Sequence, residues 1–325
     1  MLSRTHLSPV ARPAYPAYRP FRVTVRRLLP LSPHLVRVTV TGPDLAVFGT
    51  TGLDQRVKLM FPLRGRLCEI GADDETTIRE GAWYARWRAL PDDERCPLRT
   101  YTVRQVRPDV GELDVDMVRH ADGGGPAASW LAAARVGDEL VVVGPDARSA
   151  EVTGIDWRPG HAQHLLLAGD ETAAPAICSI VESLDGPTAQ AIIEVPSADD
   201  ILSVYPRGRS RITWLARDGG CTTAEGVRDV APHGLLLTQT VRTWLTRHTT
   251  LLAGALGTPT EPDDVDIDAE LLWESPPDPA GGDFYAWIAG EAAMVRDLRR
   301  LLRGAIGPGN AAFLGYWRAG RAEPQ

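Results

Sequence analysis

The chain has 325 residues, of which 44% are hydrophobic and 24% are charged, and its net charge is −7. This length exceeds the usual size of one core and suggests two domains, while the composition is that of a soluble globular protein. The acidic balance excludes a general nucleic-acid binder, which needs a basic face to neutralise phosphates. No apolar run approaches the ~20 residues of a membrane span, and the N-terminus has no apolar core of signal-peptide length.

The four cysteines lie far apart in the sequence, so their spacing matches no zinc or iron–sulfur motif and no metal site is predicted. Scattered cysteines in a chain of this size are typical of reduced, intracellular proteins. Together with the absence of a signal peptide, this favours the cytoplasm.

The first part of the chain predicts a small antiparallel barrel. Residues 1–17 are rich in proline and are expected to form a flexible arm. From residue 18 to about 155, apolar and polar residues alternate in six short segments, which predicts a six-stranded antiparallel barrel. The six segments are "FRVTV", "HLVRVTV", "VKLMFP", "LRTYTVRQV", "ELDVDMVRH" and "DELVVVGP". A polar insertion over 64–96 and a short helix, "PAASWLAAARVG", interrupt them.

The second part, residues 156–325, has a different pattern. Apolar strands alternate with helical segments, which is typical of a parallel sheet that helices cover on both faces. The five predicted strands are "HLLLAG", "AQAIIEV", "SRITWLAR", "DFYAWIAGE" and "AAFLGYW". An insertion at about 217–282 holds one predicted helix and an acidic, proline-rich linker. The predicted fold class is therefore β followed by α/β.

One predicted strand, "PLRTYTVRQV" at 97–106, carries residues suited to a cofactor. An arginine on a strand can pair with a phosphate through two parallel hydrogen bonds. Tyr101 lies two residues after Arg99, so both side chains project from one face, and the tyrosine can stack on an aromatic ring. Thr102 can offer its hydroxyl or backbone to the polar edge of that ring. The alternative is an ordinary strand with a half-buried tyrosine.

Two further segments have the form of anion or ligand sites. In "HADGGGPAASW", residues 120–130, glycines and a proline open a helix, whose free N–H groups can bind phosphate. In "LLLAGDETAAPAI", residues 165–177, a strand ends in polar residues before a helix, the place where open α/β sheets bind ligands. The alternatives are a flexible turn in the first case and helix capping by Asp170 and Thr172 in the second.

Taken together with "VKLMFP", "WIAGE" and "GYWRAGR", these motifs resemble the FAD-dependent siderophore-interacting proteins of the ferredoxin–NADP reductase superfamily. The resemblance runs from about residue 18 to the end of the chain. It implies an FAD-binding (FR-type) barrel at 18–155, an NAD(P)H-binding-like domain at 156–325, and a cytoplasmic ferric-siderophore reductase. Electrons from NADH, NADPH or ferredoxin would pass through FAD to siderophore-bound Fe(III) and release Fe(II). The alternatives are a flavin oxidoreductase with another acceptor and a non-catalytic siderophore-binding protein.

The same resemblance implies roles for individual residues. FAD would carry the chemistry, so no side chain is expected to act as a catalytic acid or base. The FAD contacts would be Arg99, Tyr101, Thr102, His120, Gly124, Gly125, Ala127, Ser129, Asp170 and Thr172. Gly290, Glu291, Tyr316 and Trp317 would lie on the nicotinamide side.

The substrate contacts follow from charge. Many ferric siderophores are anionic, so a basic pocket beside the flavin is expected, and the residues proposed for it are Lys58, Arg148 and Arg318. Arg321 stands where some relatives carry a lysine, which leaves the class of electron donor open. We expect a monomer, with neither nucleic acid nor membrane as a partner.

The choice between NADH and NADPH is inferred from the residue that ends the second predicted strand of the α/β part. Glu194 ends the second predicted strand of the α/β part, where an acidic residue can accept a hydrogen bond from an adenosine ribose, and this favours NADH. Arg207, Arg209 and Arg217 lie close enough in sequence to permit NADPH.

Overall fold

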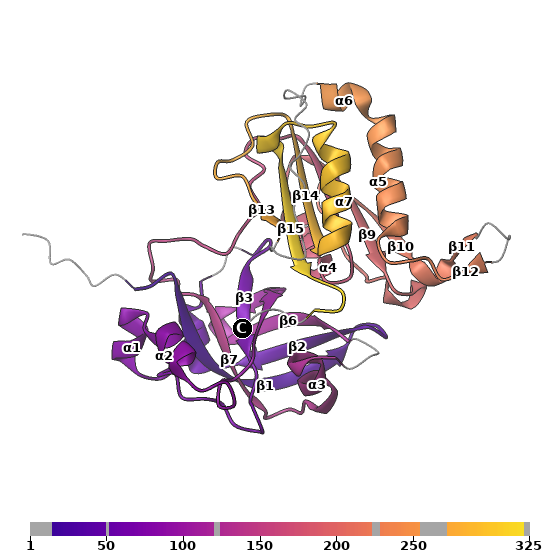
Figure 1. The fold of residues 1–325 in the computed structure, drawn as a ribbon. Helices are drawn as coiled ribbons and strands as arrows, with labels where there is room; N and C mark the ends of the chain where they lie inside the picture. Colours follow the sequence, from indigo (N-terminus) through magenta and orange to yellow (C-terminus); the bar gives the residue numbers. More distant parts are fainter. Residues whose placement is uncertain (1–14, 50–51, 120–123, 223–227, 254–271, 322–325) are drawn as a thin grey trace, which may run out of the picture.

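The computed structural model describes residues 15–49, 52–119, 124–222, 228–253 and 272–321. Most of the predicted N-terminal arm (1–14) and His120 lie outside these residues. Two sheets form the molecule, one in each half of the chain, and they lie one above the other (Figure 1). Within the described residues, no helix is both long enough and apolar enough to cross a membrane.

The first sheet has seven strands, all paired antiparallel, in the order β4-β3-β7-β1-β2-β6-β5. The sheet curls, and the backbone N–H of Arg104, just after β4, donates to the carbonyl of Asp114 on β6 at 2.9 Å. The curled sheet encloses an apolar core that includes Phe21 and Val142. Its strands are β1 (Tyr18–Pro30), β2 (Leu35–Thr41), β3 (Arg56–Met60), β4 (Leu98–Thr102), β5 (Gln105–Arg107), β6 (Glu112–Val118) and β7 (Glu139–Pro145).

The expectation of six strands was wrong because "LRTYTVRQV" forms two strands. β4 ends at Thr102, where Val103 donates its N–H to the carbonyl of Gln55 (2.8 Å), and β5 pairs only with β6. The predicted 64–96 insertion contains helices α1 (Glu75–Glu80) and α2 (Trp83–Ala89), and the predicted short helix is α3 (Pro126–Ala133). Trp83 and Trp87 of α2 cover the outer side of the sheet.

The second sheet has six strands in the order β10-β9-β8-β14-β15-β13. Five are parallel as predicted, but β13 pairs antiparallel with β15, so the sheet is mixed rather than parallel. Its strands are β8 (His164–Gly169), β9 (Thr188–Val195), β10 (Arg211–Ala216), β13 (Trp273–Glu274), β14 (Phe284–Glu291) and β15 (Ala311–Trp317). The predicted insertion supplies β13, and also a hairpin of β11 (Cys221–Thr222) and β12 (Arg228–Asp229).

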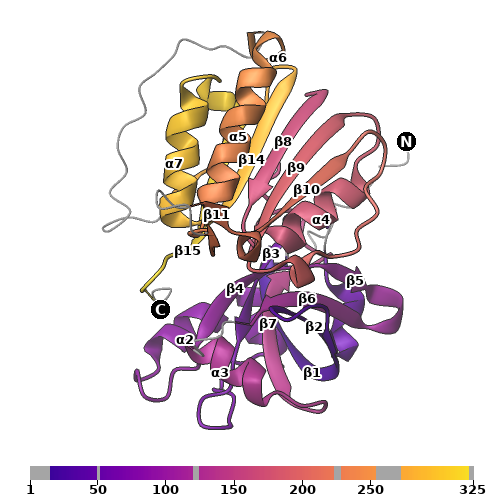
Figure 2. The ribbon, with the colours of Figure 1, turned by 90° about the vertical axis from the view of Figure 1, so that its right-hand side faces the viewer.

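Helices cover both faces of the second sheet, as the apolar strands predicted (Figure 2). One face packs on α4 (Ala174–Ser183) and the other on α5 (Leu235–Arg247) and α7 (Ala292–Arg303). The single helix predicted in the insertion is divided at His248 into α5 and α6 (Thr249–Ala253).

Several polar contacts join the two halves of the chain. Arg104 pairs with Glu182 of α4 at 2.6 Å. His34, before β2, pairs with the buried Asp200 at 2.8 Å, and Asp54, before β3, accepts a hydrogen bond from Trp287 of β14 at 3.0 Å. The segments that precede β2 and β3 and follow β4 therefore contact the second half of the chain.

Candidate functional site

The pairing of β3 with β4 decides which side chains of the "RTYT" motif project together. Arg99 lies opposite Leu59 and Tyr101 lies opposite Val57. Side chains alternate along a strand, so Arg99 and Tyr101 share one face of the curled sheet. Both residues are only partly buried, and the ring of Tyr101 approaches Phe61 edge-on at 6.4 Å. This arrangement fits the predicted pairing of a phosphate contact with a ring contact.

The glycines before α3 lie at the surface. Gly124 and Gly125 are exposed, and Gly125 has φ +93°, a conformation that other residues rarely adopt. A methyl group added at either glycine would meet no atom within 4 Å, so the start of α3 is open to a ligand. Ser129 is exposed within the first turns of α3, while Ala127 packs against the barrel core.

The carboxyl ends of β8, β14 and β15 meet at Asp170, which is fully buried. Its carboxylate accepts hydrogen bonds from the backbone of Thr172 (2.9 Å), the backbone of Glu291 (2.8 Å) and the indole of Trp317 (2.9 Å). His233, before α5, lies 3.4 Å away. Burial alone would raise the pKa of Asp170, but its hydrogen bonds and the charge of His233 hold that pKa below its usual range.

Gly290 and Glu291 both have structural roles beside Asp170. Gly290 has φ +141°, and a Cβ there would come within 2.7 Å of the Asp170 carboxyl carbon. Glu291 caps α7, accepting hydrogen bonds from Ala293 (2.7 Å) and Met294 (3.0 Å). Helix capping thus describes Glu291, and the nicotinamide contacts predicted for Gly290 and Glu291 stay predictions.

Glu194, the residue predicted to contact a ribose, is enclosed by protein hydrogen-bond donors. It is fully buried, and its carboxylate accepts hydrogen bonds from the backbone of Gly234 (2.6 Å) and Leu237 (2.9 Å) at the start of α5. Arg217 also bridges it to Glu171, at 3.3 and 3.1 Å. Glu194 therefore caps the start of α5, with its oxygens enclosed by protein donors, and its predicted ribose contact stays a prediction. Arg217 is held between two carboxylates, and a phosphate contact by this residue also stays a prediction.

The three basic residues predicted for the substrate do not converge. Lys58 lies opposite Thr100, on the other face of β3 and β4 from Arg99, and its ammonium donates to the Thr100 hydroxyl at 3.0 Å. Arg318 follows β15, next to Ala319, whose N–H donates to Glu291 (3.2 Å).

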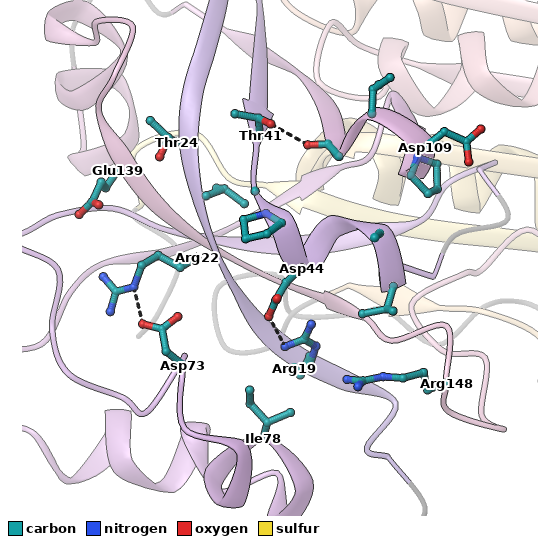
Figure 3. Close-up of a pocket in the computed structure, with 18 of the residues that line it drawn as sticks. Arg19, Arg22, Thr24, Thr41, Asp44, Asp73, Ile78, Asp109, Glu139 and Arg148 are labelled. Carbon is teal, nitrogen blue, oxygen red and sulfur yellow. Dashed lines mark hydrogen bonds and ion pairs between the residues drawn. The ribbon is translucent and has the colours of Figure 1, made fainter.

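Arg148 lines a pocket of about 1000 Å³ on the barrel, together with Arg19 and Arg22 (Figure 3). Its guanidinium pairs with Asp146 at 2.6 Å and lies 3.6 Å from the centre of the Tyr15 ring. Neither Lys58 nor Arg318 is among the described residues that line this pocket. The structure therefore separates Arg148 from the other two predicted contacts.

Between the two sheets, Tyr316, predicted for the nicotinamide side, meets two tryptophans that the sequence analysis did not single out. Tyr316 stacks on Trp273 and meets Trp287 edge-on, with ring centres 5.9 and 6.2 Å apart. Its hydroxyl is buried next to Thr102 and forms no well-aligned hydrogen bond within the described part of the chain. Burial raises the pKa of Tyr316 well above its ordinary value. Tyr316 thus brings the end of β15 against the end of the "RTYT" strand.

These observations fit an FAD site on the barrel. Arg99 and a partly exposed Tyr101 share one strand face, the glycine-led start of α3 is open, and the buried Tyr316 hydroxyl lies beside Thr102. The residues that sequence reasoning missed are Asp54 and His233. Neither stands in a recognisable motif, and only the packing of distant segments places them at the junction of the sheets and at the Asp170 hub.

Comparisons with known proteins divide the chain in the same way. Residues 24–149 match a family model described as a siderophore-interacting FAD-binding domain, and residues 162–320 match the model of siderophore-interacting proteins. The chain belongs to the siderophore-interacting protein family. Its first half is accordingly an FAD-binding domain of that family.

Individual members of the siderophore-interacting family show how far the likeness extends. An uncharacterized protein of Mycobacterium tuberculosis is 29% identical over 90% of this chain and 88% of its own length. The ferric vibriobactin reductase ViuB of Vibrio cholerae is 32% identical over 58% of this chain and 63% of its own. The solved structure of the siderophore-interacting protein SipS from Aeromonas hydrophila has a TM-score of 0.61 and 23% identity, covering 94% of each chain. At that identity, the structural match shows the fold alone.

Proposed function

We propose that this protein is a cytoplasmic, FAD-dependent reductase of ferric siderophores that uses a nicotinamide nucleotide as its electron donor. The observation that carries the proposal is the position of Arg99 and Tyr101 on one face of β4, directly before Thr102 and its contact with Tyr316. The relative named as a ferric vibriobactin reductase supports the choice of reaction. We propose 18–155 as the FAD domain and 156–325 as the domain on the donor side.

In this proposal the chain's own residues bind and orient FAD. Arg99 pairs with a phosphate of FAD, and the amides at the start of α3 hold the neighbouring phosphate. Tyr101 covers one face of the flavin ring, while Tyr316 and Trp317 close the site from the second sheet and exclude water. FAD itself, when bound, supplies the transfer of electrons.

The substrate enters the proposal through charge and iron chemistry. Lys58 is proposed to attract an anionic ferric siderophore, with Arg318 as a second contact. Reduction releases the metal because Fe(II) binds hard oxygen ligands more weakly than Fe(III) does. The donor is proposed to be NADH or NADPH, with ferredoxin as the alternative, and the helix-capping contacts of Glu194 weaken the preference for NADH over NADPH.

The test begins with the absorbance spectrum of the purified protein, before and after addition of FAD. We expect a flavin spectrum that bleaches anaerobically with NADH or NADPH, and formation of Fe(II) from a ferric siderophore in the presence of a ferrous chelator. A protein that takes up no FAD would refute the proposal. Flavin turnover that does not change on adding the siderophore would instead identify an oxidoreductase with another acceptor.

A further inference from the structure

Cys68 and Cys96 are 28 residues apart in the sequence, but their side chains meet in the fold. Cys68 follows a tight turn in which Leu63 and Arg66 exchange backbone hydrogen bonds, and Cys96 stands two residues before β4. The N–H of Cys68 donates to Cys96 Sγ at 2.9 Å, and the two thiols also hydrogen-bond each other. The spacing of the cysteines in the sequence did not predict this contact.

The two sulfur atoms differ in their exposure. Cys96 is fully buried beneath α2, and its carbonyl accepts a hydrogen bond from the indole of Trp87 at 2.9 Å. Cys68 is partly exposed, with its sulfur 3.6 Å from that of Met60. A small solute can therefore reach Cys68 from solvent, while Cys96 lies behind it.

The contact also changes the acidity of Cys96. The hydrogen bond from the Cys68 thiol, reinforced by the Cys68 N–H, lowers the pKa of Cys96, and the same thiol contact raises the pKa of Cys68. Burial without such donors has the opposite effect at Cys178, where it raises the pKa to about 12. Because the thiolate is the attacking form in disulfide chemistry, Cys96 is suited to attack a neighbouring disulfide, and Cys178 is not.

We propose that Cys68 and Cys96 form a reversible disulfide by exchange with a low-molecular-weight disulfide. Cys68 and Cys96 share a proton through their hydrogen bond. When Cys96 holds that proton, the Cys68 thiolate attacks the small disulfide and forms a mixed disulfide with one half, and the other half takes the proton from Cys96 and leaves as a thiol. The Cys96 thiolate then attacks the Cys68 sulfur and expels the second small thiol. Two protein thiols are oxidised to one disulfide, one small disulfide is reduced to two thiols, and the two protein protons end on those thiols.

The bond would close the segment that contains α1 and α2 into a loop, and it would restrain the chain three residues before Arg99. Disulfides in reducing compartments are usually redox-sensing or catalytic rather than structural. The site therefore offers a redox response at the start of β4. This inference does not depend on the proposed reductase activity, because it concerns thiols outside the FAD contacts.

The experiment uses the full-length, reduced protein and oxidised glutathione as the probe. After incubation, remaining thiols are alkylated, and the protein is cleaved with trypsin without reduction. Cleavage after arginine places Cys68 in peptide 67–79 and Cys96 in peptide 96–99. We expect these peptides to appear as one linked species, lighter than their sum by two hydrogens, with Cys178 and Cys221 alkylated. Added dithiothreitol should separate the two peptides.

Three variants sharpen the result. Cys96→Ser should stop at a glutathione adduct on Cys68, and Cys68→Ser should leave Cys96 alkylated. Cys178→Ala is the matched control, which should still give the linked peptides. Wild-type protein whose Cys68 and Cys96 both remain alkylated, or whose Cys68 keeps a stable glutathione adduct without the link, would overturn the proposal.

Discussion

The indole nitrogen of Trp287, in the middle of β14, donates a 3.0 Å hydrogen bond to the Asp54 carboxylate from the loop before β3. The same carboxylate oxygen accepts the N–H of Asp156 at 3.1 Å, while its other oxygen is buried without a hydrogen-bond partner among the described residues. Burial, and then the negative charge of Asp156, raise the pKa of Asp54 to about 6. The contact that joins the two sheets therefore includes a carboxyl group that resists ionisation.

Replacing this carboxyl by a neutral amide should stabilise the protein at neutral pH. The pKa of Asp54 is higher in the folded state than in the unfolded state, so ionising this group destabilises the fold. The free energy of unfolding therefore falls as the pH rises from about 4 to about 6, and it stays lower above pH 6. Asp54→Asn keeps an acceptor for Trp287 and should add up to about 3 kcal/mol at pH 7. Denaturant unfolding at pH 4 and 7 measures this, with the exposed Asp185→Asn as control; equal effects of both variants would contradict it.

The pair of Asp170 and His233 should make the free energy of unfolding depend on pH for the opposite reason, because here the fold favours the charged form of His233. Burial opposes charging of His233, but the hydrogen bond and charge of Asp170 outweigh it and raise the pKa of His233 above 6.5. The stabilisation is thus fully present below pH 6.5 and is lost as pH rises through the folded-state pKa of His233. We expect His233→Gln to flatten the fall in unfolding free energy over that range. An unchanged slope in the variant would show that another group titrates there.

Glu194 should matter for stability and not for the choice of nicotinamide. Its oxygens cap α5 and pair with Arg217, so Glu194→Ala should cost about 3–5 kcal/mol by leaving buried donors and a charge unpaired. Glu194→Gln keeps one carbonyl acceptor and should lose less. The ratio of kcat/KM for NADH and NADPH should be the same in Glu194→Gln and the wild type, and a marked shift toward NADPH would support the ribose role.

Arg99 should be needed for FAD retention. Arg99→Ala should weaken FAD binding by on the order of 1.5–3 kcal/mol, the worth of a charge-assisted hydrogen bond or pair. Arg104→Ala is a matched control from the same segment, because the side chain of Arg104 pairs with Glu182 and does not share the strand face of Tyr101. Fluorescence titration of the apoprotein with FAD should separate the two variants, and comparable affinities would remove Arg99 from the site.

Lys58 and Arg148 should differ in their effect on the substrate. Lys58→Ala should raise the siderophore KM on the order of tenfold, or about 1.4 kcal/mol, and leave FAD affinity intact. Arg148 is already paired with Asp146 and stacked on Tyr15, so Arg148→Ala should change the KM little. Steady-state assays with one ferric siderophore compare them. A larger rise in KM for Arg148→Ala would place the substrate at the pocket of Figure 3 instead.

The boundaries that sequence reasoning missed share one physical cause. Between Thr102 and Gln105 the apolar pattern continues, but Val103 donates its N–H to the carbonyl of Gln55, before β3, and Arg104 donates to Asp114 of β6. The chain changes partner there, and a single predicted strand becomes two. β13 is two residues long and pairs only because β15 offers an open edge. In each case a partner strand distant in the chain ends or creates the strand. The alternation of apolar and polar residues within a segment does not identify that partner.

The sequence by itself determined the two-part architecture, the positions of the long strands along the chain and the shared face of Arg99 and Tyr101, because period-two alternation and apolar runs follow from local backbone geometry. Only the tertiary structure decided that Glu194 caps a helix, that Arg148 lies apart from Lys58, and that Cys68 meets Cys96. These relationships depend on where segments far apart in the chain come to rest. Burial and hydrogen bonding then set the charge and the availability of each side chain.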